Sequence, residues 1–501
     1  MNIADILLKI WTFFVNNFLT QPAYFIGLIV VIGYILLRKP WYDVLAGFIK
    51  AVVGYMILIV GSGGLVGNFR PILVGLKDRF NLDAMVIDPY FGQNAVTAGL
   101  EPVFGRAFTG VMILLLIAFI FNIALVALRK FTKMRSIFTT GHVQIQQAST
   151  AFWIMLFCFP NLNDTPILLL MGLILGLYWA VGTNLTVKIT QDLTDGAGFA
   201  IAHQQMFGLA LFTNLAERMN KGKNQSKKLE DIKLPGFLKI FNENIVATSI
   251  LMTLFFGVIL LILGKPYLVE KEFMKETQTF GFYIMTTSFN FAVYLSILQL
   301  GVRTFVTELT HSFQGISHKL LKGAVPGVDC AVSYGFGSPN AVTMGFLFGA
   351  LGQFLAIAAL IVLKSPVLVI AGFVPVFFDN ATIGVYANNK GGIRAAMLFP
   401  FISGLCQVFG SAFIASFVGM AAYGGYLGMW DWAVVWPVFT IAMKYLSYVG
   451  VALIVIFLVA IPQLQYRANK KTYFLETEDW DACKAIRAEE AAAKQAAKAA
   501  K

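Results

Sequence analysis

The stretch VMILLLIAFIFNIALVAL, from Val111 to Leu128, decides the fold class. It contains no charged side chain, and about 20 apolar residues are needed for a helix to cross the hydrocarbon of a bilayer. Similar stretches run from Ile245 to Leu263 and from Val434 to Ile461. The whole chain is 58% hydrophobic and 13% charged, whereas about a quarter of the residues in soluble proteins are charged. We therefore predict an all-α polytopic membrane protein.

The positions of the basic residues predict its topology, because short loops rich in Lys and Arg stay on the cytoplasmic side. Arg38 with Lys39, the loop 129–135 and the segment from Arg218 to Lys239 are predicted to be cytoplasmic, whereas residues 160–165 contain no base and are predicted to lie outside. The amino terminus then lies outside and the carboxyl terminus lies in the cytoplasm. The net charge of +12 has the same origin, so it does not indicate a nucleic-acid partner.

About eleven transmembrane helices follow from this topology, with residues 83–100 and 195–215 forming re-entrant helical hairpins that return on the side they entered. Residues 304–322, which include His311 and His318, are predicted to form an amphipathic helix along the cytoplasmic surface. The basic loop with Arg70, Lys77 and Arg79 conflicts with the predicted topology, because it would lie outside. The spans are expected at 12–37, 43–66, 103–128, 137–158, 166–187, 244–264, 280–302, 341–364, 367–388, 395–420 and 432–462.

The chain divides into a membrane-embedded part, residues 1–466, and a charged, alanine-rich cytoplasmic tail, residues 467–501. The tail combines helix-forming residues with acid-to-base spacings that pair on one helix face. We expect a solvated helix with no chemical role, and we interpret Cys483 within it as incidental. Cys158, Cys330 and Cys406 share no close spacing with Cys483 or with one another, which indicates neither a disulfide framework nor a zinc cluster.

Enzyme motifs are not found in the sequence. It has no His-Glu-x-x-His metal motif and no phosphate-binding P-loop, and the glycine-rich stretch 61–64 has no His or Asp near it in sequence. We therefore predict no catalytic residue, no metal site and no cofactor.

An internal repeat organises the membrane part. The segment from Asp88 to Val96 is echoed by the segment from Asp329 to Val342, with an Asp, an aromatic residue, a Gly and Asn-Ala-Val in the same order. Each copy is a short, Gly- and Pro-interrupted segment before a long span. In transporters built from inverted repeats, such segments indicate the binding site.

Two clusters of neutral polar residues interrupt otherwise apolar sequence, at 141–147 and at 202–205. Amides and imidazoles left without partners in hydrocarbon cost several kcal/mol each. His142 and Gln146 share one helix face, since four residues separate them. Together with His203, Gln204 and the ionisable Asp329 they predict a polar ligand cavity within the membrane.

Structural alternatives exist for these residues. His142 and Gln146 could simply bond to another span, and Asp329 could cap the helix that follows it. Tyr90 could be an anchor at the membrane surface. His311 and His318 are best explained as part of the amphipathic helix.

Four long strings resemble the ascorbate-specific IIC component of the bacterial phosphoenolpyruvate-dependent phosphotransferase system, within the ascorbate/galactitol IIC superfamily. The resemblance extends to about Arg467. The strings occupy residues 140–147, 195–205, 234–246 and 380–388.

The resemblance implies an inner-membrane homodimer in which a V-shaped dimerisation part holds a moving, elevator-like core that carries L-ascorbate. It also implies separate IIA and IIB proteins, with phosphorylated IIB as the partner that phosphorylates the substrate. The family's substrate contacts are a Thr-Tyr pair, a His-to-Gln pentapeptide, a His-Gln pair and an Asp. Matching positions here are Pro89, Tyr90, His142, Val143, Gln144, Ile145, Gln146, His203, Gln204 and Asp329.

One position departs from the family pattern, because Pro89 replaces the Thr and removes a hydroxyl. Its contact is therefore expected to be made through the backbone or by packing. A galactitol or other polyol permease is the alternative within the superfamily. From the residues alone, a channel or an intramembrane enzyme is a further alternative without a supporting motif.

Overall fold

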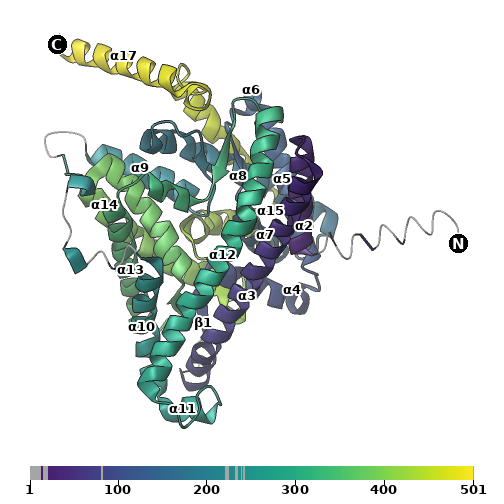
Figure 1. Cartoon of the computed structure of the whole chain (residues 1–501), viewed down its shortest axis with the longest axis vertical. Coiled ribbons are helices and arrows are strands. Elements are labelled where there is room, and N and C mark those ends of the chain that lie inside the picture. The colour runs from purple at the N-terminus through teal and green to yellow at the C-terminus, as the bar shows by residue number, and fades with distance from the viewer. Residues whose placement is uncertain are drawn as a thin grey trace.

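Helices make up most of the computed structural model in Figure 1. It describes residues 9, 13–14, 18, 21–80, 83–220, 225–231, 235–237, 240 and 243–499. Within these residues, six helices are long and apolar enough to cross a membrane, which agrees with a multi-pass membrane protein. The expected span 12–37 and the basic segment from Arg218 to Lys239 lie only partly within the described residues. The six helices cover Trp41–Gly61, Thr109–Ala127, Asp164–Thr194, Pro339–Val362, Pro375–Phe417 and Trp430–Ala468.

Two long helices, α3 (Trp41–Phe80) and α12 (Phe280–Leu320), pack along each other. Figure 1 shows them running together to the short helix α11 (Lys265–Glu270) at one tip of the molecule. Helices α2 (Pro22–Leu36) and α10 (Asn244–Leu263) pack beside them. We call these five helices the scaffold.

The expected amphipathic helix at 304–322 is not a separate surface element. Residues 304–320 continue α12 without a break. Within this part Glu308 is buried, and its carboxylate accepts hydrogen bonds from the Tyr34 hydroxyl at 2.5 Å and from the Lys50 ammonium at 3.1 Å. A helix lying along the cytoplasmic surface would leave this carboxylate in water, so the expectation is corrected.

Six short strands form two parallel sheets, which the prediction of an all-α protein missed. The strand order is β5-β1-β6 in one sheet and β2-β4-β3 in the other. Strands β2, β3, β5 and β6 are buried throughout. Such strands appear in sequence as short apolar runs without alternation, so they could not be distinguished from the ends of apolar helices. The strands are β1 (Asp83–Ile87), β2 (Ser136–Phe138), β3 (Ala200–Ile201), β4 (Val325–Val328), β5 (Val367–Ala371) and β6 (Gly425–Tyr426).

The two sheets follow one plan. Each central strand comes from one half of the chain, and both of its neighbours come from the other half. The carboxyl ends of parallel strands meet at one edge, so the residues that follow the strands of one sheet are brought together. The expected re-entrant segments 83–100 and 195–215 each hold a strand followed by a helix, namely β1 with α4 (Pro89–Phe104) and β3 with α9 (Met206–Met219).

Helix α15 (Trp430–Ala468) folds back on itself at Ser447, whose φ is 51°. The rings of Phe439 and Phe457 lie 6.2 Å apart, whereas 18 residues of straight helix would separate them by about 27 Å. The expected span 432–462 is therefore not one straight helix. Helix α14 (Asn380–Phe417) is also kinked, at Gly392 with a φ of 66°.

The remaining helices surround the two sheets and, with α4, α9, α14 and α15, form what we call the core. Its interior includes the fully buried rings of Trp153, Trp179, Trp432 and Trp436. The helices are α5 (Thr109–Ala127), α6 (Arg129–Thr132), α7 (Gly141–Cys158), α8 (Asp164–Thr194) and α13 (Pro339–Val362), with shorter turns η2 (Leu229–Asp231), η4 (Cys330–Gly335), η5 (Pro375–Asp379) and η6 (Met420–Tyr423).

The first part of the tail packs against the core, contrary to the expectation of a solvated segment. Helix α16 (Leu475–Glu478) places Glu476 against the buried guanidinium of Arg135, which also donates to the Tyr473 carbonyl at 2.7 Å. Helix α17 (Trp480–Ala499) begins beside Asp195, whose carboxylate accepts from the Trp480 indole at 3.0 Å. Figure 1 shows the far end of α17 extending away from the molecule.

Candidate functional site

Three polar side chains meet at the carboxyl edge of the β2-β4-β3 sheet. His142 follows β2 in the first turn of α7, His203 follows β3, and Asp329 follows β4 directly. The His142 Nε2 atom lies 3.3 Å from an Asp329 carboxylate oxygen, and the two imidazole rings are 6.4 Å apart. Parallel strand order therefore brings together residues that are far apart in the sequence.

Glutamines join the two histidine-containing segments. The Gln204 amide nitrogen donates to the Gln146 side-chain oxygen at 2.7 Å, and the Gln147 amide donates to the His203 carbonyl at 3.2 Å. The Gln205 side-chain oxygen lies 2.7 Å from His203 Nδ1. Since that oxygen only accepts, Nδ1 carries the proton and Nε2 is left as an acceptor in the neutral ring.

The carboxyl edge of the β5-β1-β6 sheet contacts the same region. Asp88 follows β1 and accepts from the Tyr90 backbone nitrogen at 3.0 Å at the start of α4. The Tyr90 hydroxyl interacts with the side chain of Gln146. Asp431, shortly after β6, accepts from the Phe207 nitrogen at 3.1 Å. The candidate site thus lies between the carboxyl edges of two sheets.

Tyr90 and Pro89 are both buried in the core. This burial excludes the alternative in which Tyr90 anchors the protein at the membrane surface. Pro89 occupies the first turn of α4, where its missing N–H costs little. It offers the site neither a hydroxyl nor a backbone donor, so packing is the contact available to its side chain.

Helix α7 begins without a side-chain cap. Its first residues are Gly141, His142 and Val143, whose backbone N–H groups have no partner within the helix. The neighbouring elements differ, because Asp88 caps α4 and Asp329 accepts from the Ala331 nitrogen at the start of η4. An uncapped helix start is favourable for an anion.

Three buried side-chain atoms at this place have no hydrogen-bond partner among the described residues. They are His142 Nδ1, Gln204 Oε1 and Thr140 Oγ1. Buried polar groups are nearly always paired in folded proteins, so these three atoms beside an uncapped helix start have capacity for a polar ligand.

Two predicted site residues point elsewhere. The Gln144 amide donates to the Phe138 carbonyl at 3.4 Å, back toward β2, and Ile145 is buried in the apolar core. They support α7 from behind. Asp329 in turn combines both predicted roles, because one oxygen caps η4 while the other faces His142.

The scaffold closes one side of the site, which sequence reasoning did not foresee. The ring of Phe305 on α12 lies 6.2 Å from that of His142 and 5.8 Å from that of Tyr55 on α3. Tyr55 also interacts with the side chain of Gln93 on α4. Phe305 falls in the segment 304–322 that was expected to lie along the membrane surface, so its ring was not expected to reach the site.

The donor atoms of His142, His203 and Asp329 lie within 4.8 Å of one another. Two imidazoles and a carboxylate are ligands that a divalent metal ion prefers. The direct contact between His142 and Asp329 gives both groups a partner without an ion, however, and the surrounding amides suit an organic ligand better.

Comparison with known proteins identifies the family of the chain. A family described as the PTS system sugar-specific permease component matches residues 17–432. The chain belongs to this family. A similar protein, the "Ascorbate-specific PTS system EIIC component" of Mycoplasma pneumoniae, is 35% identical over 436 residues, which cover 79% of this chain. The match spans 65% of the length of that relative. The resemblance inferred from the four strings is therefore confirmed at the level of the family.

Proposed function

We propose that this permease component binds L-ascorbate between the two sheet edges and carries it into the cell for phosphorylation. The name of the Mycoplasma pneumoniae relative supports the substrate. The observation that carries the proposal is the uncapped start of α7 beside the unpaired His142 Nδ1 and Gln204 Oε1. Ascorbate has one negative charge at neutral pH and several hydroxyls, so it requires both an anion-compatible helix start and neutral partners.

Six of the predicted residues receive a role in this proposal. The enediolate oxygens accept from the backbone N–H groups at the start of α7, including that of Val143. Ligand hydroxyls pair with Gln146, Gln204 and the acceptor nitrogen of His203. Asp329 is kept away from the anionic part of the ligand. Its carboxylate holds His142 and also accepts a hydrogen bond from a ligand hydroxyl.

Transport is proposed to follow an elevator mechanism in a homodimer of eleven-span subunits. The support is that the site lies where the core meets α3 and α12 of the scaffold, through Tyr55 and Phe305. Sites at such boundaries, built at the ends of broken helices in inverted repeats, are typical of secondary transporters. The shared plan of the two sheets supports the inverted repeat, with residues 1–466 as the permease domain and 467–501 as the cytoplasmic tail.

Phosphorylated IIB, supplied by IIA, is the proposed cytoplasmic partner. Accumulation then requires chemical trapping of the sugar, since binding alone does not concentrate it. The basic segment from Arg218 to Lys239 and the residues 304–322 are the proposed docking surface for IIB. Part of the first segment lies outside the described residues.

The proposed orientation in the bacterial inner membrane has the amino terminus outside and the carboxyl terminus inside. Asn163 and Lys130 are both exposed, and the predicted topology puts them on opposite sides of the membrane. A Cys introduced at Asn163 is expected to react with impermeant thiol reagents in intact cells, whereas one at Lys130 is expected to react after lysis. The opposite pattern would invert the topology.

Calorimetry on the purified protein tests the substrate. Titration with ascorbate is expected to give a saturable heat of binding. Galactitol, which has no charge, is expected to bind at least tenfold more weakly, a loss of about 1.4 kcal/mol of binding free energy. Stronger binding of galactitol would assign the chain to the polyol branch of the superfamily. Current through a reconstituted bilayer without IIB would instead indicate a channel, and turnover of ascorbate without partners would indicate an enzyme.

A further inference from the structure

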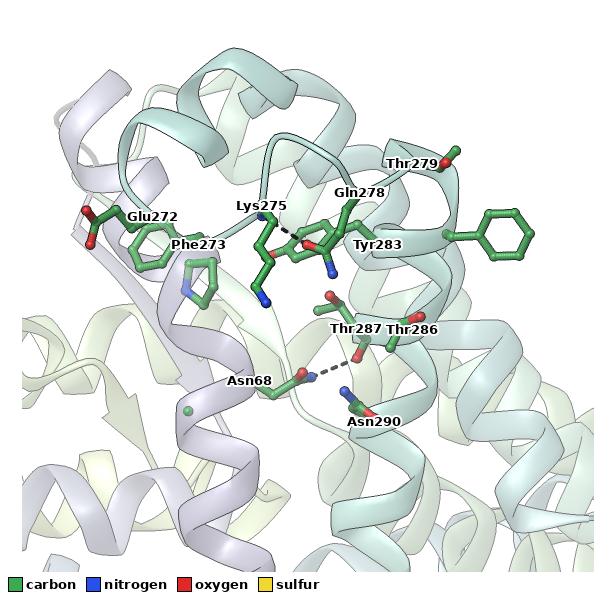
Figure 2. A pocket seen from close by; sticks show the side chains of 13 residues that line it. Asn68, Glu272, Phe273, Lys275, Gln278, Thr279, Tyr283, Thr286, Thr287 and Asn290 are labelled. Atoms are coloured by element: carbon green, nitrogen blue, oxygen red, sulfur yellow. Dashed lines mark hydrogen bonds between the residues drawn. The ribbon is translucent and has the colours of Figure 1, made fainter.

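A cavity lies in the scaffold, apart from the candidate site. It has a volume of about 570 Å³ and is lined by the second half of α3, the start of α12 and the connection between α11 and α12. Small-molecule sites usually measure about 300–1,000 Å³. Figure 2 shows its lining, which includes Asn68, Lys275, Gln278, Tyr283, Thr287 and Asn290.

Two charged side chains, those of Glu272 and Lys275, line this cavity, and the ammonium is the one that points inward. Figure 2 shows the Lys275 side chain pointing into the cavity toward Asn68, whereas the carboxylate of Glu272 points away at the other side. Within the described part of the chain, the Lys275 ammonium forms no ion pair. Lys271, four residues earlier, is different because it pairs with Asp78 at 3.0 Å.

Neutral hydrogen-bonding groups complete the lining. The Asn68 amide donates to the Thr287 carbonyl at 2.8 Å, which ties α3 to α12. The Gln278 side-chain oxygen accepts from the Lys275 backbone nitrogen at 3.0 Å, so the amide nitrogen of Gln278 remains as a donor. One ammonium among amides and hydroxyls is complementary to a small anion that carries hydroxyl groups.

The cavity and the candidate site share the same pair of helices. Phe305 at the site follows Asn290 on α12, and Asn68 follows Tyr55 on α3. At 1.5 Å per residue, the two places are separated by about 20 Å along each helix. In the proposed orientation the cavity lies at the outer end of the scaffold, on the side from which the substrate arrives.

We propose that this cavity is an outer subsite that captures a small, polyhydroxylated monoanion before the anion reaches the site between the sheets. The inference rests on the proposed function, since its ligand is of the same chemical class as ascorbate. A single exposed Lys attracts an anion mainly by raising the rate of encounter, and this attraction is weakened by salt. The subsite is therefore weak and fast, and it feeds the deeper site.

Kinetics of ascorbate uptake test the subsite in cells that contain IIA and IIB. Lys275→Gln is expected to raise the KM about threefold or more at low ionic strength and to leave the maximal rate unchanged. Its matched control is Lys271→Gln, which removes the same charge from the same connection but outside the cavity lining. An unchanged KM in Lys275→Gln, or an equal rise in both variants, would overturn the proposal.

A labelling experiment separates the subsite from the deeper site. Thr286 is exposed and lines the cavity, so a Thr286→Cys protein is labelled with an impermeant thiol reagent, with the parent chain as the control for native cysteines. Ascorbate is expected to slow labelling even when His203→Ala is added. Protection that disappears with His203→Ala, or no protection in a protein that binds ascorbate, would refute the outer subsite alone. A wild-type protein that binds no ascorbate would refute the proposed function.

Discussion

The carboxyl edges of the two sheets have the same topology, but Asp431 at one edge and His142 and Gln204 at the other differ in hydrogen bonding. At the β5-β1-β6 edge, Asp431 accepts from the Phe207 and Gly208 nitrogens at 3.1 and 3.0 Å and from the Tyr178 hydroxyl at 2.7 Å. At the β2-β4-β3 edge, His142 Nδ1 and Gln204 Oε1 have no partner among the described residues. The Asp431 carboxylate is fully bonded by the chain itself, whereas the second edge keeps unused donor and acceptor atoms for a ligand.

The same sheet architecture therefore serves two purposes, stability and ligand binding. A buried carboxylate fully bonded to backbone N–H groups fixes the helices around it, because removing it would leave several donors unpaired. Imidazoles and amides with unused atoms cost stability until a ligand binds. We therefore expect changes at Asp431 to affect folding, and changes at the second edge to affect binding.

The largest expected effect concerns the opposite, amino edge of the site sheet, where the tail holds Arg135 directly before β2. Glu476→Ala would leave the buried Arg135 guanidinium without its carboxylate, and removing one partner of a buried pair costs about 3–5 kcal/mol. Thermal unfolding in detergent should show a clearly lower midpoint.

Glu478→Ala is the matched control, because Glu478 forms a more exposed pair with Arg129 at 2.5 Å. Exposed pairs contribute about 0–1 kcal/mol, so its midpoint should stay close to that of the wild type. Equal stability of the two variants would contradict the bracing role of the tail, and would restore the expectation of a detached segment after residue 467.

Asp431→Ala is expected to destabilise the fold by about 2–4 kcal/mol, since three donors lose their acceptor and each unpaired buried group costs about 1–3 kcal/mol before relaxation. The folded fraction should bind ascorbate nearly as well as the wild type. Unfolding and calorimetry on the same sample measure both quantities. A loss of affinity without a loss of stability would show that Asp431 acts on the ligand and not on the fold.

His203→Ala is expected to give the opposite pattern, with ascorbate affinity lowered by about 1–3 kcal/mol and folding largely kept. His311→Ala serves as the control, because His311 is an exposed histidine on α12. Calorimetry that found wild-type affinity in His203→Ala would remove this residue from the site.

The sequence alone predicted that these polar residues lie together, for a physical reason. His142, Gln146, His203, Gln204 and Asp329 are polar groups in apolar surroundings, and such groups are too costly to bury without a shared partner. The structure brings these five together. Their grouping could be expected from composition and position, without knowledge of the strands that place them.

Other features could not be predicted, because no local pattern encodes them. Each sheet takes its central strand from one half of the chain and its neighbours from the other, and strands of two to five residues give too little periodicity to detect. The role of Phe305 and the docking of the tail depend on contacts between distant segments. The tail has the composition of a solvent-exposed segment, although Tyr473, Glu476 and Cys483 within it are buried.

The smallest expected effect is that of Cys483→Ser on phosphorylation. Burial raises the pKa of the Cys483 thiol, so the thiol remains protonated and is a poor phosphoryl acceptor. Its sulfur faces the Thr472 carbonyl at 3.9 Å, inside the packed start of the tail. Vesicles that contain the variant with intact IIA and IIB should phosphorylate ascorbate at nearly the wild-type rate. Loss of phosphorylation with ascorbate binding intact would make Cys483 a phosphoryl carrier. The tail would then contribute chemistry, in addition to bracing the amino edge of the site sheet.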